Sequence, residues 1–132
     1  KATESRDANA NAHYQLGCSY YHEGEGVERD EEKVVYHWEK AAIGGHPKAR
    51  HNLAIIEDDN GNIERAVKHL IIAANLGSEK SMQALWKFYS DGNITKEDLE
   101  STLRSHKAAL DATKSAQREE AEAYFQRISA SR

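Results

Sequence analysis

The sequence of 132 residues contains one cysteine and one proline, and it has no long apolar run. The single thiol, Cys18, cannot form an internal disulfide, which favours a reducing, cytoplasmic compartment without establishing one. No stretch of about 18 apolar residues is present, so we expect no membrane insertion. The net charge of -4 gives no support for general nucleic-acid binding. The sequence starts at Lys1 without a basic and apolar leader, and we therefore expect a fragment or a processed form.

The sequence is rich in residues that favour helices, and it contains an internal repeat. Residues 38–49 match residues 70–81, because each stretch has two alanines, then a glycine suited to a helix C-terminus, then a new helix start. In the same register, Leu53 lies 32 residues before Leu85, and Leu16 lies 37 residues before Leu53. The pattern predicts helix pairs that stack on one another, because a single pair of this size cannot bury its own apolar stripe.

Turn and capping residues predict seven helices and no sheet. The expected breaks lie near residues 23–30, 44–46, 59–62, 77–78, 91–95 and 112–115. The expected N-caps are Asp30, Asn62, Ser78 and Thr95, with Asp7 or Asn9 at the start of the first helix. Pro47 suits the first turn of a helix. The N–H groups of that turn have no hydrogen-bond partner within the helix, so the N–H that proline lacks is not needed there.

The repeat also predicts which side chains are buried. We expect a core formed by Leu16, Trp38, Ala41, Leu53, Ala73 and Leu85. The last helix is expected to begin at Ser115 and to turn Ala121, Tyr124, Phe125 and Ile128 inward, because these residues share one face at helical spacing.

The first copy resembles the Sel-one-like repeat family, which is related to the tetratricopeptide repeats. The resemblance rests on Ala12, Tyr14, Leu16, Gly17, Tyr20 or Tyr21, Gly24, Gly26, Val27, Asp30, Lys33, Trp38, Ala41, Ala42 and Gly45. It implies an all-α fold, a right-handed α/α superhelical solenoid of antiparallel helix pairs, and a role as an adaptor or scaffold. We expect a single domain, residues 1–132, with repeats at about 8–44, 45–77 and 78–94 and capping helices at 95–132.

The resemblance further implies that the first helix of each pair lines a concave surface that binds a protein or peptide. With Leu16, Leu53 and Leu85 as anchors, three rows of residues fall on this surface. The rows are Asn11, Tyr14, Cys18, Tyr21 and His22; Lys48, His51, Ile55 and Asp58; and Lys80, Gln83, Lys87 and Ser90. The lysines suit an acidic peptide, and the alternative is an ordinary solvated face.

Three functions stay open, in decreasing order of support. The first is a protein-interaction module or adaptor, the second is an architectural spacer or oligomerisation segment of a larger protein, and the third is a small Cys-dependent hydrolase. The hydrolase would use Cys18 with His22 one turn later, but no complete nucleophile, base and acid set can be assembled. The seven histidines lack the spacing of a zinc site, and the glycines at 24 and 26 lack the third glycine and the strand of a phosphate loop. We therefore expect no metal and no cofactor.

Overall fold

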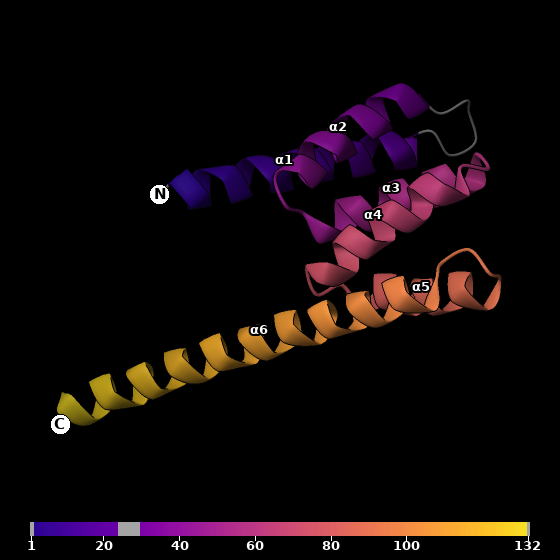
Figure 1. Cartoon of the computed structure of the whole chain (residues 1–132). Coiled ribbons are helices and arrows are strands. Elements are labelled where there is room, and N and C mark those ends of the chain that lie inside the picture. The colour runs from indigo at the N-terminus through magenta and orange to yellow at the C-terminus, as the bar shows by residue number, and fades with distance from the viewer. Residues whose placement is uncertain (1, 24–29, 132) are drawn as a thin grey trace.

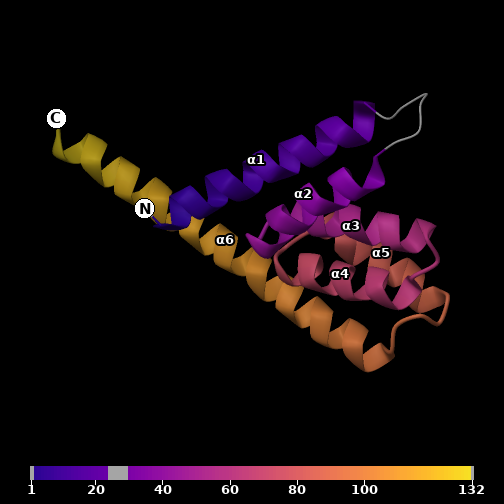
Figure 2. The same cartoon turned by 90° about the horizontal axis from the view of Figure 1, so that it is seen from above.

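The computed structural model describes residues 2–23 and 30–131, and every regular element within them is an α-helix. The helices are α1 (Ala2–Glu23), α2 (Glu31–Ile43), α3 (Pro47–Asp59), α4 (Ile63–Asn75), α5 (Glu79–Ser90) and α6 (Lys96–Ala130). Figure 1 shows three stacked antiparallel pairs, α1 with α2, α3 with α4, and α5 with the first part of α6. Helices α1, α3 and α5 form one layer, and α2, α4 and α6 form the other (Figure 2). The described residues therefore confirm the expected all-α solenoid.

Most helices begin where the sequence predicts. The side chains of Asp30, Ser78 and Thr95 each accept the backbone N–H three residues ahead, at 3.1–3.3 Å. Such caps satisfy N–H groups that have no partner inside the helix. Asn62 occupies the N-cap position of α4, but its side chain makes no capping hydrogen bond. The glycine-containing loop expected at residues 24–29 lies outside the described residues.

The start expected for the first helix is wrong, because α1 begins at Ala2 rather than at Asp7 or Asn9. Both residues are possible N-caps, but neither glycine nor proline stands between residues 2 and 9 to end a helix there. The helix therefore continues through them.

Glycines end the second helix of the first two pairs. Gly45 has a φ of +90° and Gly77 a φ of +101°, which side chains with a Cβ rarely adopt. The N–H of Gly45 donates to the carbonyl of Ala42 at 2.9 Å, and the N–H of Gly77 donates to the carbonyl of Ala74 at 2.9 Å. In each copy, the alanine pair and the glycine thus end the helix and let the chain reverse its direction.

The core is built where neighbouring pairs meet. Trp38, Ala41, Leu53, Ala73 and Leu85 are at most 3% exposed, as the repeat predicts. One apolar cluster joins α2 to α3, and a second joins α3, α4, α5 and the start of α6. The apolar seam therefore runs through the stack of pairs.

Leu16 is the exception, because it is 45% exposed although it was expected in the core. Its counterparts Leu53 and Leu85 are covered by the preceding pair, through the clusters that contain Trp38 and Leu70 respectively. No described helix precedes α1, so the same position lies open on the first pair.

Helix α6 is one continuous helix of 35 residues, so the break expected at 112–115 and the seventh helix are wrong. Ser115 can act as an N-cap, but no glycine or proline interrupts residues 96–130, and residues with high helix propensity lie on both sides. A capping residue without a helix-breaking residue before it does not end a helix.

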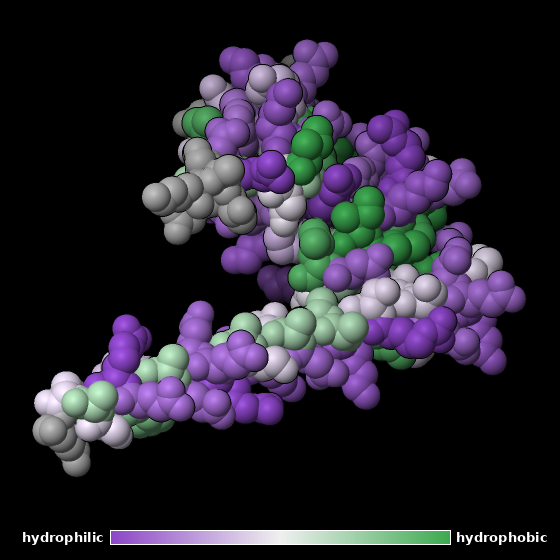
Figure 3. All heavy atoms as spheres, turned by 60° about the vertical axis from the view of Figure 1, so that its left-hand side comes forward, coloured by the Kyte–Doolittle hydropathy of each residue, from purple (hydrophilic) through white to green (hydrophobic). Residues whose placement is uncertain are grey.

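The second half of α6 extends beyond the helix pairs as an arm (Figures 1 and 3). Its first half packs on α4 and α5 through Leu99 and through His106, whose Nδ1 lies 2.9 Å from the carbonyl oxygen of Ala74. The residues expected to turn inward are exposed: Tyr124 by 56%, Phe125 by 66% and Ile128 by 37%, with Ala121 exposed as well. They share a face as predicted, but no other described helix covers that face.

Candidate functional site

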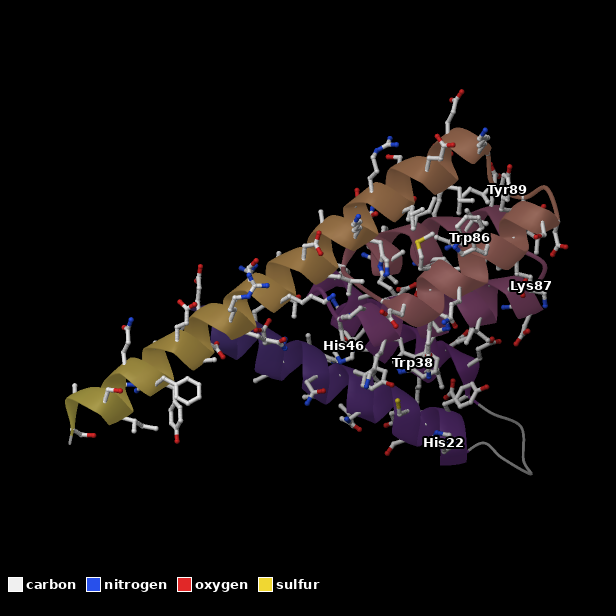
Figure 4. The ribbon with its side chains drawn as sticks, turned by 90° about the horizontal axis from the view of Figure 1, so that it is seen from below. His22, Trp38, His46, Trp86, Lys87 and Tyr89 are labelled. Atoms are coloured by element: carbon white, nitrogen blue, oxygen red, sulfur yellow. The ribbon has the colours of Figure 1, made fainter. Side chains whose placement is uncertain are left out.

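A groove runs along the layer formed by the first helix of each pair. It consists of three cavities of about 280, 480 and 200 Å³. Tyr14 and Asn52 line both the first and the second cavity, His51 lines the second and the third, and Ile55 lines the first and the third. Because the cavities share these walls, they form one continuous surface on α1, α3 and α5. Figure 4 shows Trp38 and His22 toward the α1 end of this surface and Lys87 on α5.

The first cavity of the groove has aromatic residues among its walls. Tyr14, Cys18, Tyr21, Trp38 and Ile55 are among its walls. The Trp38 Nε1–H donates to the backbone carbonyl of Tyr14 at 3.3 Å, and the ring of Tyr21 lies 5.5 Å from that of Trp38. The ring of Tyr21 is thus held against the buried Trp38, and Tyr14 and Tyr21 are the half-buried aromatic residues of this cavity.

Tyr14 forms the boundary between the first and second cavities. Its ring stacks on that of His46 at 4.3 Å. Burial, followed by hydrogen bonding and charge interaction with Cys18, raises the pKa of Tyr14 above its usual value, with an opposing contribution from Asn52. The phenol therefore stays protonated at neutral pH and can donate a hydrogen bond.

The second cavity of the groove has charged residues among its walls. Lys48 of α3 and Lys80 of α5 are exposed and line it together with His51 and Glu79. His51 Nδ1 lies 2.8 Å from the Ser81 hydroxyl oxygen. Burial, and then the charge of Lys80, lower the pKa of His51 below its usual value. This part of the groove therefore presents lysine ammonium groups beside a neutral imidazole.

The third cavity lies between α3 and α5. It has an apolar wall that includes Ile55 and Phe88, and charged residues, Asp58 and Lys87, at its edge. The groove thus carries apolar and charged surface side by side, with Ile55 in the walls of the first and third cavities and lysines at the second and third.

Most of the residues expected to bind a partner meet in this groove. Those that line it are Tyr14, Cys18, Tyr21, His22, Lys48, His51, Ile55, Asp58, Lys80 and Lys87. Asn11, Gln83 and Ser90 are exposed but line none of the three cavities. The register of the repeat thus places residues of three helices side by side, whereas their binding role stays a proposal.

Two functional candidates were missed from the sequence. Asn52 faces both the first and the second cavity, and the tetratricopeptide pattern gave no reason to expect it there. Ser81 is fully buried behind His51. Its signal was present in the sequence, because it is a polar residue at the position that Ala49 fills in the preceding copy.

Within residues 2–23 and 30–131, no group of three or more His, Cys, Asp or Glu side chains could hold a metal ion. His13 and His37 lie close together across α1 and α2, with 3.0 Å between their Nδ1 atoms, as in a hydrogen bond between the rings. None of the described helices is both long enough and apolar enough to span a bilayer.

Comparison with known proteins gives one finding on the family. The model of the Sel1 repeat matches residues 10–46 and residues 47–78, which together are more than half of the chain. A comparison with curated proteins finds no match. The two matched segments contain α2, α3 and α4 and most of the groove residues of α1 and α3.

Proposed function

Since the chain belongs to the Sel1 repeat family, whose repeats are typically protein–protein interaction modules, we propose that it binds a peptide segment of another protein in the groove of α1, α3 and α5. One observation supports this proposal above all others. Three cavities joined by shared walls run across the first helices of all three pairs. A continuous groove with apolar and polar sections suits an extended or helical peptide better than a compact small molecule.

The chemistry of the groove indicates what kind of peptide it holds. Tyr14, Tyr21 and Ile55 offer apolar surface, which favours an aliphatic or aromatic anchor in the partner. Lys48 and Lys80 line the central cavity, and Lys87 lines the third, which favours acidic groups. Long-range attraction is modest, because the chain carries a net charge of -4 and salt screens exposed charges beyond about 8 Å.

The test begins with a pull-down in which the parent chain is compared with the variant Tyr21→Ala/Lys80→Glu. Proteins enriched on the parent and lost on the variant are the partner candidates. Binding kinetics of each single variant at two salt concentrations then follow. Tyr21→Ala should act mainly by faster dissociation, because it removes contact area, and Lys80→Glu mainly by slower, salt-dependent association.

Matched controls separate the groove from the rest of the surface. Lys68→Glu on α4 makes the same charge change on an exposed residue of the other layer. Tyr36→Ala on α2 removes an aromatic ring that is 54% exposed. Tyr21 packs against Trp38, so circular dichroism must show that Tyr21→Ala stays folded before its kinetics are interpreted. If both groove variants bind a partner as tightly as the parent, the groove is not the site.

A second candidate function, an architectural or oligomerisation segment, is favoured by the exposed face of α6. Tyr124, Phe125 and Ile128 form an uncovered apolar surface on the arm. Light scattering coupled to size-exclusion chromatography tests this candidate. A concentration-dependent dimer that Phe125→Glu abolishes would support it, and a strict monomer would leave the groove as the functional surface.

A further inference from the structure

We propose that His51 is the specificity-determining residue of the groove, and that its Nε2–H donates a hydrogen bond to a carboxylate of the bound peptide between Lys48 and Lys80. This inference rests on the proposed function, because it assumes that a peptide occupies the groove. It adds to that function the position of the peptide carboxylate and the residue, His51, that donates a hydrogen bond to it.

A chain of hydroxyl groups fixes the orientation and the proton of His51. The backbone N–H of Ser81 donates to the Ser78 hydroxyl at 3.2 Å, and the Ser78 hydroxyl donates to the Ser81 hydroxyl at 3.0 Å. The Ser81 hydroxyl oxygen lies 2.8 Å from the Nδ1 atom of His51. When the Ser81 proton is directed at Nδ1, as this inference requires, the neutral ring carries its own proton on Nε2.

The position of Ser81 in the repeat sets it apart from an ordinary core residue. Ser81 is 0% exposed, and its counterpart in the preceding pair, Ala49, is also 0% exposed. Alanine therefore packs well at the equivalent position of the preceding pair, and the Ser81 hydroxyl is not needed for packing. What the hydroxyl does is bind a ring that lines two cavities.

The surroundings of the ring favour a carboxylate over other groups. Nδ1 is occupied by the buried serine, so the Nε2–H edge is the one left for a ligand. From α3 the ring is accompanied by Lys48, from α5 by Glu79 and Lys80, and from α1 by Tyr14. Burial and Lys80 lower the pKa of His51, so that near neutral pH it offers one directed donor rather than a third positive charge. A ligand with several acceptor lone pairs and one negative charge matches this set of donors.

A carboxylate can come from the C-terminus of a peptide or from an Asp or Glu side chain, and defined peptide pools distinguish the two sources. Three pools of acetylated hexapeptides share random aliphatic and aromatic positions. The first pool has a free C-terminus and no acidic side chain, the second has an amidated C-terminus and one internal Asp or Glu, and the third has no carboxylate. We expect the first or the second pool to bind at least about tenfold more tightly than the third, as for a hydrogen bond to a charged group.

Substitutions assign this preference to His51. His51→Leu should remove most of the advantage of the carboxylate pool and leave only the part due to Lys48 and Lys80, whereas His51→Gln, which keeps an N–H near the position of Nε2, should retain more of it. Ser81→Ala should fold like the parent, because alanine occupies the same position in α3, and should weaken carboxylate binding about threefold to tenfold through loss of the fixed tautomer. Ser101→Ala, at an exposed position of α6 outside the groove, is the matched control and should bind like the parent.

Nitrogen-15 NMR of the imidazole rings measures the tautomer directly, without any peptide. The parent should have a protonated Nε2 and an unprotonated Nδ1 at His51, and Ser81→Ala should lose this preference. A protonated Nδ1 in the parent would overturn the inference. So would equal binding of all three pools, although the proposed function would then stand. If no pool binds at all, the proposed function fails and this inference fails with it.

Discussion

The sharpest prediction about the fold concerns the contact between Gly17 and Trp38. A Cβ added at Gly17 would lie 2.3 Å from Cδ1 of Trp38, a separation that atoms in real structures do not tolerate. In the second pair the corresponding residues are Ala54 and Leu70, which are 2% exposed each and belong to one cluster. The same space between the two helices is thus filled by glycine with tryptophan in one pair and by alanine with leucine in the next.

Because the larger residue of the first pair faces the smaller one, we predict that the effects of substitutions at Gly17 and Trp38 on stability are coupled. Gly17→Ala should lower the free energy of unfolding by about 1–2 kcal/mol, because overpacking costs about 1–3 kcal/mol and alanine regains up to about 1 kcal/mol of helix propensity. Trp38→Leu should cost about 2–4 kcal/mol, since it leaves a cavity and removes the hydrogen bond to the Tyr14 carbonyl. The double variant recreates the packing of the second pair, so we expect it to be at least about 1 kcal/mol more stable than the sum of the single changes predicts.

Urea unfolding followed by far-UV circular dichroism measures all four proteins of this cycle, with reductant present to keep Cys18 free. The slopes of the transitions must agree, so that the midpoints report stability rather than a change in the unfolded state. Additivity within about 0.5 kcal/mol would refute the argument, because it would mean that the two side chains do not compete for the same space.

Three further predictions follow from the core, the turns and the histidines. Trp38→Ala should lower the free energy of unfolding by roughly 3–5 kcal/mol, and a loss below about 1 kcal/mol would show that Trp38 is peripheral. Gly45→Ala should cost about 1–2 kcal/mol in the same urea assay, because its φ of +90° strains any residue with a Cβ, and Gly45→Asn should cost less. The histidines with a lowered pKa are His37, His46, His51 and His69. The free energy of unfolding should be highest above pH 6.5 and should fall as the pH drops below 6.5, because the unfolded chain then binds more protons than the folded chain. Each histidine can lower it by at most about 1.4 kcal/mol per pH unit. A free energy of unfolding that stays constant from pH 7.5 to 5 would contradict this.

The repeat register could be predicted from the sequence because it depends on local features. Helix caps, glycines at helix ends and an alanine pair each act within a few residues of the chain, and each is present in the sequence as a residue type at a fixed spacing. Once the register is known, the resemblance to the tetratricopeptide repeats indicates which residues of α1, α3 and α5 face the groove. Ten of the residues placed on the concave rows line the groove for this reason.

The wrong predictions concern features that depend on what lies beside a helix rather than within it. Leu16 has the same local sequence context as Leu53, but no described helix pair covers it. Tyr124 and Phe125 have the spacing of a buried stripe, and the same spacing describes an apolar face that no other described helix covers. Periodicity predicts which residues share a face, but it does not state whether a partner for that face exists.

The groove has a further consequence for how the partner is specified. In each pair the repeat needs small or apolar residues where helices meet, as at Ala49 and Leu53. The groove positions differ between the pairs, since Lys48 and His51 in α3 have Asn11 and Tyr14 as their counterparts in α1. A family match therefore predicts the groove but not its ligand. Ser81 connects the two sets of positions, because it is a buried position of the repeat whose polar group supports a groove residue. A polar residue at a repeat position that is otherwise alanine is thus a sign, visible in the sequence, of the surface residue that has a specific task.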